Sequence, residues 1–302
     1  MTARSAAEKT QFDGLQKWVG RTQESSDLVS ANVVAKMAAA LDHQNPQLTE
    51  GSFLPLPWHW LFFTPTPQAS ATGQDGHPKT GDFLPPVPLP RRMWAGSKVE
   101  VHQPLQIGDK LTCTSTVESV VPKSGRQGEL VFVSVAHRLF KGNQEPVLTE
   151  IQDIVYRAMP TGPAPVAPEY TPELAPQWSK TITPDPVMLF RYSALTFNGH
   201  RIHYDRNWAV DAEGYPGLVV HGPLIATLLI DLMYSNLGPV EIARFTFRGV
   251  QPLFDLEPFT VNGARDGNTV KLWALTPGNQ LAMSLEVELK GANETSLTGA
   301  RG

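Results

Sequence analysis

The 302-residue chain has a single cysteine, Cys113, and this scarcity limits its chemistry. One cysteine cannot form an internal disulfide or supply the several thiolates of a zinc cluster. The chain therefore suits a reducing compartment. Because Cys113 lies in the alternating stretch Leu-Thr-Cys-Thr-Ser-Thr-Val, it is interpreted as a structural residue of a strand.

Long hydrophobic runs and strong charge are also missing. The most apolar segment, Leu224–Met233, is far shorter than the roughly 20 residues that cross a bilayer. The first residues contain Glu8 and Asp13 and no apolar core, which argues against a signal or transit peptide. A net charge of −4 without a basic run gives no support for binding nucleic acid or a membrane surface. The sequence predicts a cytoplasmic protein without either partner.

What the chain does contain indicates a packed protein with an internal duplication. An apolar share of 41% and seven tryptophans favour a compact interior. An alternating segment breaks at Pro104-Leu105, and a similar segment breaks at Pro252-Leu253, about half the chain later. The proline-rich segment Met159–Trp178 is interpreted as a linker, with a long loop inside one domain as the alternative. These features predict a first unit over 1–158, a linker over 159–180 and a second unit over 181–302.

Each half is expected to hold helices followed by strands. In the second half, proline favours the first turn of a helix and Gly238 suits a position just past a helix end. The helices expected there are Pro186–Leu195 and Pro223–Asn236, the latter buried all round, and the strands are Glu241–Val250, Phe259–Ala264, Thr269–Thr276 and Leu281–Lys290. The first half is expected to have helices at Asp27–Leu41 and Pro57–Phe63 and strands at Val99–Val101, Lys110–Val121, Glu129–Phe140 and Leu148–Arg157.

The most informative segment is Arg191–Asp205, with the sequence RYSALTFNGHRIHYD. It places an amide, Asn198, five residues before an imidazole, His203, and the sequence VVHGP that ends at Pro223 then opens the most apolar helix. Histidine titrates near neutral pH, and the unpaired N–H groups of a helix start can hold negative charge. The combination predicts proton transfer beside an oxyanion, with surface or packing histidines as the alternative.

These motifs resemble those of the MaoC-like hot-dog hydratases and dehydratases, which carry D-x-N-P-x-H followed by a helix start of the form A-H-G-M. The segments Arg191–Asp205 and Pro90–Asp109 resemble a branch with two hot-dog units per chain. That branch includes mesaconyl-CoA and itaconyl-CoA hydratases and hydroxyacyl-thioester dehydratases. The resemblance implies an α+β double hot-dog, in which two antiparallel sheets each wrap around a central helix and one chain forms a pseudo-dimer.

The resemblance also implies a reaction. The implied enzyme is a hydro-lyase, which adds water to an enoyl thioester of coenzyme A or removes water from a 3-hydroxyacyl thioester. A short branched dicarboxylic acyl group, such as mesaconyl or itaconyl, is favoured. The alternatives are a fatty-acid-type dehydratase acting on coenzyme A or acyl carrier protein, a hot-dog thioesterase, and a non-catalytic acyl-thioester binding module. No cofactor is expected beyond the coenzyme A of the substrate, and a homodimer is left open.

Three residues are expected to carry the chemistry. His203 is expected to act as the base and to return a proton to the α-carbon. Gly222 is expected to donate its N–H to the enolate oxygen at the helix start. Asn198 stands where the family has aspartate; it cannot be a base, and it is expected to orient the water.

Other residues are weaker candidates for substrate binding. They are Tyr192, Arg201, His221, Arg91, Arg92 and Trp94. The guanidinium of Arg201 suits a carboxylate or a phosphate, with an ion pair to Asp205 as one alternative. Arg91 and Arg92 are either ligands of the nucleotide end of coenzyme A or solvated loop charges. Tyr192 and His221 either contact the site or serve packing and backbone bonding.

Metal binding is not expected, although His200, His203 and Asp205 are residue types that bind zinc. The first half has Asn45-Pro46 followed by Leu48 where the family histidine would fall. Leucine cannot move a proton. One active site per chain is therefore expected, in the second half, with His43 as a bystander at the surface or in a turn.

Overall fold

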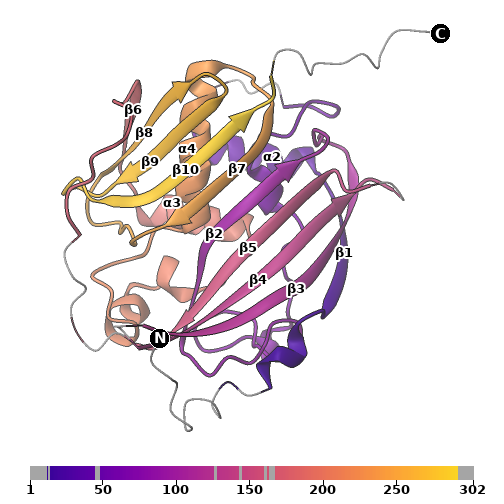
Figure 1. Cartoon of the computed structure of the whole chain (residues 1–302), viewed down its shortest axis with the longest axis vertical. Helices are drawn as coiled ribbons and strands as arrows, with labels where there is room; N and C mark the ends of the chain where they lie inside the picture. The colour runs from indigo at the N-terminus through magenta and orange to yellow at the C-terminus, as the bar shows by residue number, and fades with distance from the viewer. Residues whose placement is uncertain are drawn as a thin grey trace.

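Ten antiparallel strands form one continuous sheet in the computed structural model (Figure 1). The structure describes residues 12, 14–44, 48–125, 128–142, 145–159, 162 and 167–291. Within them, the strands of the first half are β1 (Thr22–Leu28), β2 (Arg91–Val101), β3 (Lys110–Gly125), β4 (Gly128–Phe140) and β5 (Leu148–Arg157). Those of the second half are β6 (Trp178–Ile182), β7 (Ile242–Gly249), β8 (Phe259–Asp266), β9 (Thr269–Leu275) and β10 (Leu281–Leu289).

The strand order repeats between the halves. It is β1-β3-β4-β5-β2 in the first half and, from the other edge of the sheet, β6-β8-β9-β10-β7 in the second. The two sets meet where β2 pairs antiparallel with β7, with Val99 opposite Phe245. This pseudo-symmetric arrangement confirms the double hot-dog class. It adds one feature that the pattern did not predict, because the two sheets are joined edge to edge into one.

The seam between β2 and β7 depends on glycine. A Cβ added at Gly96 would lie 2.4 Å from the carbonyl oxygen of Phe247, a distance that no side chain tolerates. The register of β2 against β5 also shifts between Trp94 and Gly96. Glycine at this position thus lets the backbones of the two halves approach.

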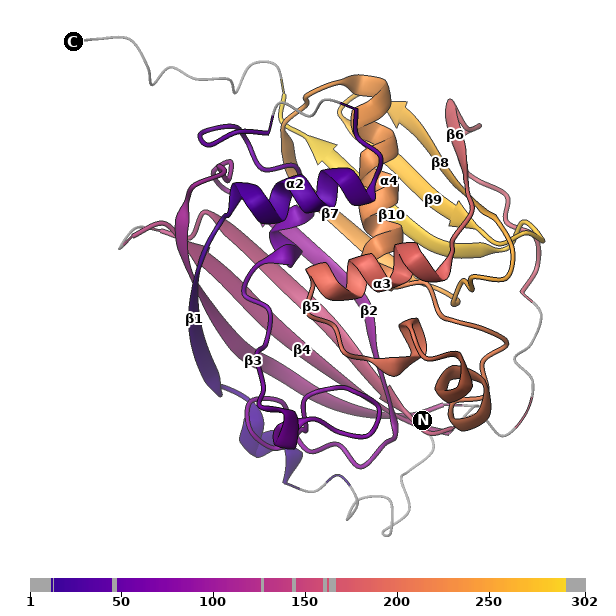
Figure 2. The same cartoon turned by 180° about the vertical axis from the view of Figure 1, so that it is seen from behind.

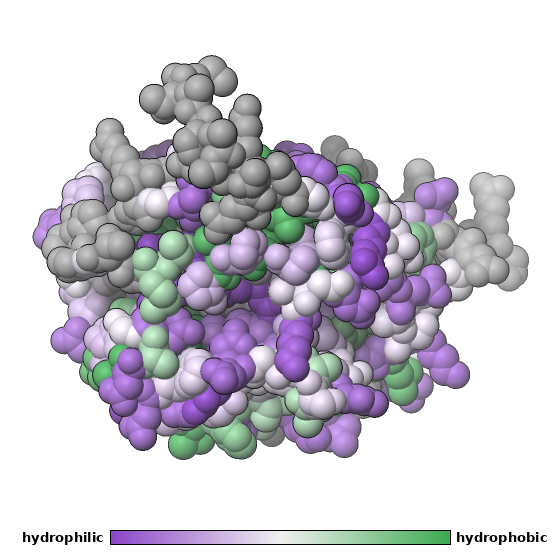
Figure 3. All heavy atoms as spheres, turned by 90° about the horizontal axis from the view of Figure 1, so that it is seen from below, coloured by the Kyte–Doolittle hydropathy of each residue, from purple (hydrophilic) through white to green (hydrophobic). Residues whose placement is uncertain are grey.

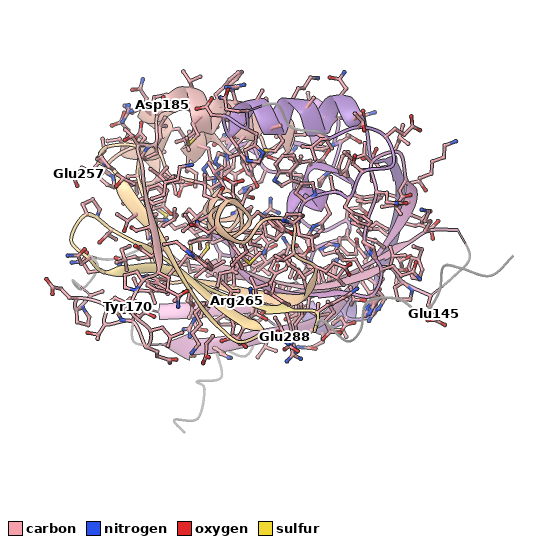
Figure 4. All side chains as sticks on the ribbon, turned by 90° about the horizontal axis from the view of Figure 1, so that it is seen from above. Glu145, Tyr170, Asp185, Glu257, Arg265 and Glu288 are labelled. Atoms are coloured by element: carbon pink, nitrogen blue, oxygen red, sulfur yellow. The ribbon has the colours of Figure 1, made fainter. Side chains whose placement is uncertain are left out.

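The helices lie on one face of the sheet. Helix α4 (Gly222–Leu237) packs on β6, β8, β9 and β10 and is buried on nearly all sides, as predicted. Helices α2 (Ala31–Ala40) and α3 (Pro186–Leu195) contact each other beyond α4 (Figures 2 and 4). The exposed carboxylate of Asp185, labelled in Figure 4, caps α3 by accepting the N–H of Met188. The sheet, α4 and the α2–α3 pair therefore form three layers.

The first half lacks a central helix of this kind. The helix predicted at Pro57–Phe63 is wrong, because the segment forms only a single 3₁₀ turn, η2 (Trp58–Leu61). Prolines at 55 and 57 remove backbone donors, and the side chain of Trp60 bonds to Glu150 instead of facing a helix groove. The helix predicted at Asp27–Leu41 begins only at Ala31, since its first residues belong to β1.

The strands were predicted best where one face is buried. The predictions around β3 to β5 and β7 to β10 are confirmed to within a few residues. Strand β2 is longer than predicted, and β1 and β6 were missed. All residues of β1 are exposed, so this edge strand is held by backbone pairing with β3 and shows no apolar alternation. The predicted linker over 159–180 falls between β5 and β6, whose first residues it overlaps; the domain division stays a prediction.

Two further expectations concern single features. Cys113 is buried on β3, and burial raises the pKa of its thiol, which makes a thiolate role unfavourable. Among the described residues, no helix is long and apolar enough to span a membrane.

A buried carboxylate ties η2 to the first-half sheet. Glu150 on β5 lies 3.2 Å from Nε2 of His59 and accepts a bond of 2.9 Å from the indole N–H of Trp60. Burial acts to raise the pKa of Glu150, but the hydrogen bond and charge of His59 outweigh it and leave the pKa below 4.5. The ionised form is therefore stabilised by folding.

We predict that Glu150→Gln lowers the free energy of unfolding at neutral pH by about 1.5–3 kcal/mol, the value of hydrogen bonds to a charged group. Because the folded pKa is depressed, this stabilisation is present above the ordinary carboxyl pKa and is lost as the pH falls through the folded one. Urea denaturation from pH 7 downward measures the gap between the two proteins. The exposed Glu100 on β2 supplies the control, Glu100→Gln, and an equal effect of the two substitutions would contradict the prediction.

Candidate active site

His203 is held by the segment that precedes α4. It ends the short turn η4 (Arg201–His203), and its Nδ1 donates a hydrogen bond of 2.7 Å to the carbonyl oxygen of Val219. The N–H of Val219 in turn bonds to the carbonyl oxygen of Ile202 at 2.9 Å. Since a carbonyl only accepts, Nδ1 carries the proton, and Nε2 keeps its lone pair. No group among the described residues bonds Nε2, so the geometry leaves it as a base.

Burial keeps this imidazole neutral. His203 is 7% exposed, and desolvation lowers its pKa to about 4, with a smaller contribution from the charge of His77. The ring of His221 stacks on it at a centroid distance of 3.6 Å and an angle of 17°. Desolvation and the neighbouring charge of His203 lower the pKa of His221 well below its usual value. Both rings are therefore uncharged near neutral pH.

His221 and Tyr192 support the base rather than act on their own. Nε2 of His221 lies 2.8 Å from the hydroxyl of Ser193 on α3, and the Tyr192 ring lies 5.0 Å from the His221 ring. Burial strongly raises the pKa of Tyr192, so its hydroxyl does not ionise near neutral pH. The stack fixes the His203 ring between α3 and the start of α4.

The start of α4 faces the first half of the chain. The nearest neighbours of a Cβ added at Gly222 would be Met283 and the carbonyl oxygen of Trp94, both at 3.9 Å. Trp94 lies on β2 and is fixed by the bond from its indole N–H to Ser97, at 2.8 Å. The N-terminus of α4, with its unpaired N–H groups, thus lies close to the seam between the halves.

Asn198 shapes the loop of the motif. Its side-chain oxygen accepts the N–H of His200 at 3.0 Å, and its own N–H bonds to the carbonyl oxygen of Ser193 at 2.8 Å. The amide oxygen is therefore already engaged by the backbone. Its expected role in orienting water falls to the amide N–H₂, which can only donate.

A loop of the first half enters the site. The N–H of Arg201 donates to the carbonyl oxygen of Asp75 at 2.8 Å, and Gly76 packs against Gly199 so closely that a Cβ on Gly76 would lie 1.8 Å from the Gly199 oxygen. His77 from this loop lies with its ring 3.8 Å from that of His200, whose ring meets His203 edge-on at 5.5 Å. Three histidine rings thus run from one half to the other.

These residues fit a carboxylate–histidine pair better than a metal site. Ligand atoms of Asp75, His77 and His200 lie within 4.8 Å of one another. However, Asp75 bonds the N–H of His77 at 3.1 Å and its Nδ1 at 2.9 Å, which uses both carboxylate oxygens. His200, His203 and Asp205, the residues considered as zinc ligands from the sequence, do not form a metal site, because Asp205 pairs with Arg201.

Comparisons with known proteins agree with this geometry. The family model for hydroxyacyl-thioester dehydratase type 2 matches residues 57–255, more than half of the chain. The chain belongs to this family. It is 42% identical over 275 residues to a mesaconyl-C(4)-CoA hydratase of Chloroflexus aurantiacus, covering 91% of this chain and 97% of that protein.

Two more similarities extend the comparison. The chain is 27% identical to the mitochondrial hydroxyacyl-thioester dehydratase type 2 of Schizosaccharomyces pombe, over 72% of this chain and 78% of that protein. A crystal structure of a MaoC-like dehydratase from Phytophthora capsici has the same fold. It superposes with a TM-score of 0.69 at 17% identity and covers 94% of this chain and 100% of that one.

The arginines of this family member take different positions. Arg201 bonds Asp205 at 2.7 Å, stacks on Trp208 with its guanidinium 4.0 Å from the ring, and donates to the carbonyl oxygen of Gln74, so its guanidinium already has protein partners. Arg91 is buried at the start of β2 and pairs with Glu213. Neither is presented to a substrate in this arrangement.

Arg92 differs from both of these arginines. It is half-buried, and among the described residues no carboxylate forms an ion pair with it. Burial lowers the pKa of His77 and of His200, and the charge of Arg92 lowers both further, which places this cation beside the histidines. This cation therefore lies near both the histidines and the Asp75 carboxylate, whose pKa its charge also lowers.

The first-half counterpart of the motif, with Leu48 and His43, has contacts of its own. Leu48 packs against the main core, and Asn45-Pro46 lie outside the described residues. His43 is more than a surface or turn residue, because its Nε2 lies 2.6 Å from Asp231 on α4 and so joins the halves.

The end of the molecule seen in Figure 3 carries mostly polar side chains with scattered apolar patches.

The Asp75–His77 pair was missed by the sequence reasoning. Its signal was the loop Gly73–His77, GQDGH, in which two glycines flank an acid and an imidazole follows. Glycine and aspartate in this order predict only a turn. Only its contact with Gly199 shows that it belongs to the site.

We predict that Gly222→Ala folds as the wild type but loses turnover by at least about tenfold. Alanine retains the backbone N–H, but its methyl group keeps the thioester oxygen from approaching it, and loss of one oxyanion donor typically costs 10²–10³. The new methyl meets only ordinary contacts in the protein, and alanine favours helix. Thermal unfolding and steady-state rates separate the two effects. Gly291→Ala, whose Cβ would lie 3.6 Å from the side-chain nitrogen of Asn268 just after β10, is the control. Full activity of Gly222→Ala would place the oxyanion donor elsewhere.

Proposed function

We propose that this protein is a hydro-lyase that adds water to an enoyl thioester of coenzyme A, with a short dicarboxylic acyl group as substrate. The observation that carries the proposal is His203, a neutral imidazole whose Nδ1 is fixed by Val219 and whose ring stacks on His221, the residue that precedes α4. A base and an oxyanion donor are the two groups that hydration of an α,β-unsaturated thioester requires.

The proposed reaction moves one proton through His203. Nε2 takes a proton from water as the water oxygen bonds to the β-carbon, and the electron pair of the double bond moves to the thioester oxygen. The N–H of Gly222 and the positive end of α4 stabilise that enolate. The imidazolium then returns its proton to the α-carbon. The reverse sequence removes water, as the name of the relative from Schizosaccharomyces pombe indicates for that protein.

The proposal of a dicarboxylic substrate depends on Arg92. A mesaconyl group carries a second carboxylate, and the relative from Chloroflexus aurantiacus is named for that thioester. The guanidinium of Arg92 lacks an ion-pair partner among the described residues, and it suits a carboxylate by its paired donors. Arg201, the arginine first considered for this role, is occupied by Asp205. We therefore assign recognition of the free carboxylate to Arg92.

The first test of the proposed function is His203→Ala, which we expect to lower kcat for enoyl-CoA hydration by ~10²–10⁴, the usual contribution of acid–base catalysis. Loss of the enoyl absorbance measures the rate. Asn198→Ala should cost less, because Asn198 holds the loop and carries no transferable proton. For the wild type, kcat/KM should stay level through neutral pH and fall as the pH drops through about 4, where His203 gains a proton. His102→Ala, an exposed histidine, is the control.

The second test separates acyl groups. We expect Arg92→Gln to lower kcat/KM for mesaconyl-CoA by roughly 10–100-fold, since hydrogen bonds to a charged group are worth ~1.5–3 kcal/mol. Crotonyl-CoA, which has no second carboxylate, should be hydrated nearly as before. Arg248→Gln on the exposed end of β7 is the control. An equal loss on both substrates would show that Arg92 serves coenzyme A or the fold instead.

A cytoplasmic location and a homodimer stay predictions. Cell fractionation and light scattering on the purified protein would test them.

A further inference from the structure

We propose that His77, oriented by Asp75, is a second catalytic histidine, which holds the attacking water opposite His203 and later holds the β-hydroxyl of the product. The proposal rests on the proposed hydration. It assigns to the first half of the chain a direct part in the chemistry, where the sequence predicts the active site in the second half alone.

The geometry of the Asp75–His77 pair resembles that of a catalytic dyad. A carboxylate accepts only, so Nδ1 of His77 donates to Asp75 across 2.9 Å, and this bond fixes the tautomer with a lone pair on Nε2. The second carboxylate oxygen accepts the N–H of the same residue. No group among the described residues bonds Nε2 of His77. The ring is half-buried, with 20% of its side chain exposed, and is therefore accessible to a small molecule in the site.

The loop is built to reach the second half. Gly76 has a φ of 88° and packs against Gly199, a contact that leaves no space for a side chain on either residue. The N–H and the guanidinium of Arg201 donate to the carbonyl oxygens of Asp75 and Gln74. These bonds attach the first-half loop to the residues between Asn198 and His203. The His200 ring contacts the His77 ring at 3.8 Å and the His203 ring at 5.5 Å, and the charge of His77 acts on His203.

The chemistry needs a second acceptor, and Asn198 does not provide one. An attacking water has two O–H bonds, of which one breaks as its proton moves to His203. The other stays intact and needs an acceptor that turns the oxygen lone pair toward the β-carbon. The oxygen of Asn198 is engaged by His200, whereas Nε2 of His77 is an acceptor with no partner in the described chain. In the product, the same O–H is the β-hydroxyl, and no further atom is gained or lost.

His77 can accept a hydrogen bond only while it is neutral. Burial lowers its pKa, the bond and charge of Asp75 raise it, and the charge of Arg92 lowers it. His200 packs against its face, and the charge of His77 acts on His203. Removal of the Asp75 charge should therefore shift the protonation of His77 to lower pH, a change that a purely structural role would not produce in the rate.

The test compares His77→Asn, Asp75→Asn and the control His102→Asn in the full-length protein, with hydration of mesaconyl-CoA or crotonyl-CoA as the assay. We expect His77→Asn to lower kcat by roughly tenfold, the value of one hydrogen bond of ~1.5 kcal/mol, with little change in KM. Asp75→Asn should lower kcat less and move the acidic limb of the pH–rate profile to lower pH. In the double variant, that movement of the limb should disappear, because no His77 remains to titrate.

Rescue distinguishes chemistry from folding. His77→Ala leaves a space at a partly exposed position, and added imidazole should restore turnover in proportion to its neutral fraction. If His77→Asn keeps the wild-type kcat, or if imidazole fails to restore a folded His77→Ala protein, the proposal is wrong. A wild-type protein that hydrates no enoyl-CoA at all would instead refute the proposed function itself.

Discussion

The structure depends on the backbone pairing of β2 with β7. This pairing converts two five-stranded sheets into one, and it requires glycine at position 96 because the backbones come too close for a side chain. It also brings Trp94 of β2 beside the start of α4. The site therefore exists only when both halves are joined, although the motif itself lies in the second.

Desolvation keeps the buried histidines near the β2–β7 seam neutral. The rings of His200, His203 and His221 are all buried, and burial is the largest cause that lowers the pKa of each. A buried histidine that stays neutral at physiological pH is available as a base without first losing a proton. Val219 bonds one nitrogen of His203, and Ser193 bonds one nitrogen of His221, whose Nδ1 has no partner among the described residues. We propose that the guanidinium of Arg92 supplies positive charge for an anionic substrate.

The two halves have diverged around the same strand order. In the second half, α4 fills the concave face of the sheet and offers its N-terminus to the site. In the first half, the corresponding segment is the single turn η2, fixed by the buried contacts of Glu150. The described part of the first half lacks the central helix, but its loop Gly73–His77 contacts Gly199 of the second half. The first half thus has no central helix among its described residues but contributes a loop to the second half. This division fits a duplicated chain with a single site.

The sequence by itself determined the features that have a local or periodic cause. Alternation predicts most strands, Pro186, Pro223 and Gly238 mark helix ends, and the spacing from Asn198 to His203 indicates the motif loop. Tertiary structure decided the rest, because it depends on contacts between residues far apart in the chain. It made Pro57–Phe63 a single turn, paired the polar strand β1 with β3, bound Arg201 to Asp205, and brought the Asp75–His77 pair to His200. Solvent exclusion at the seam, which lowers the pKa of His203, follows from the same long-range packing and from no local pattern.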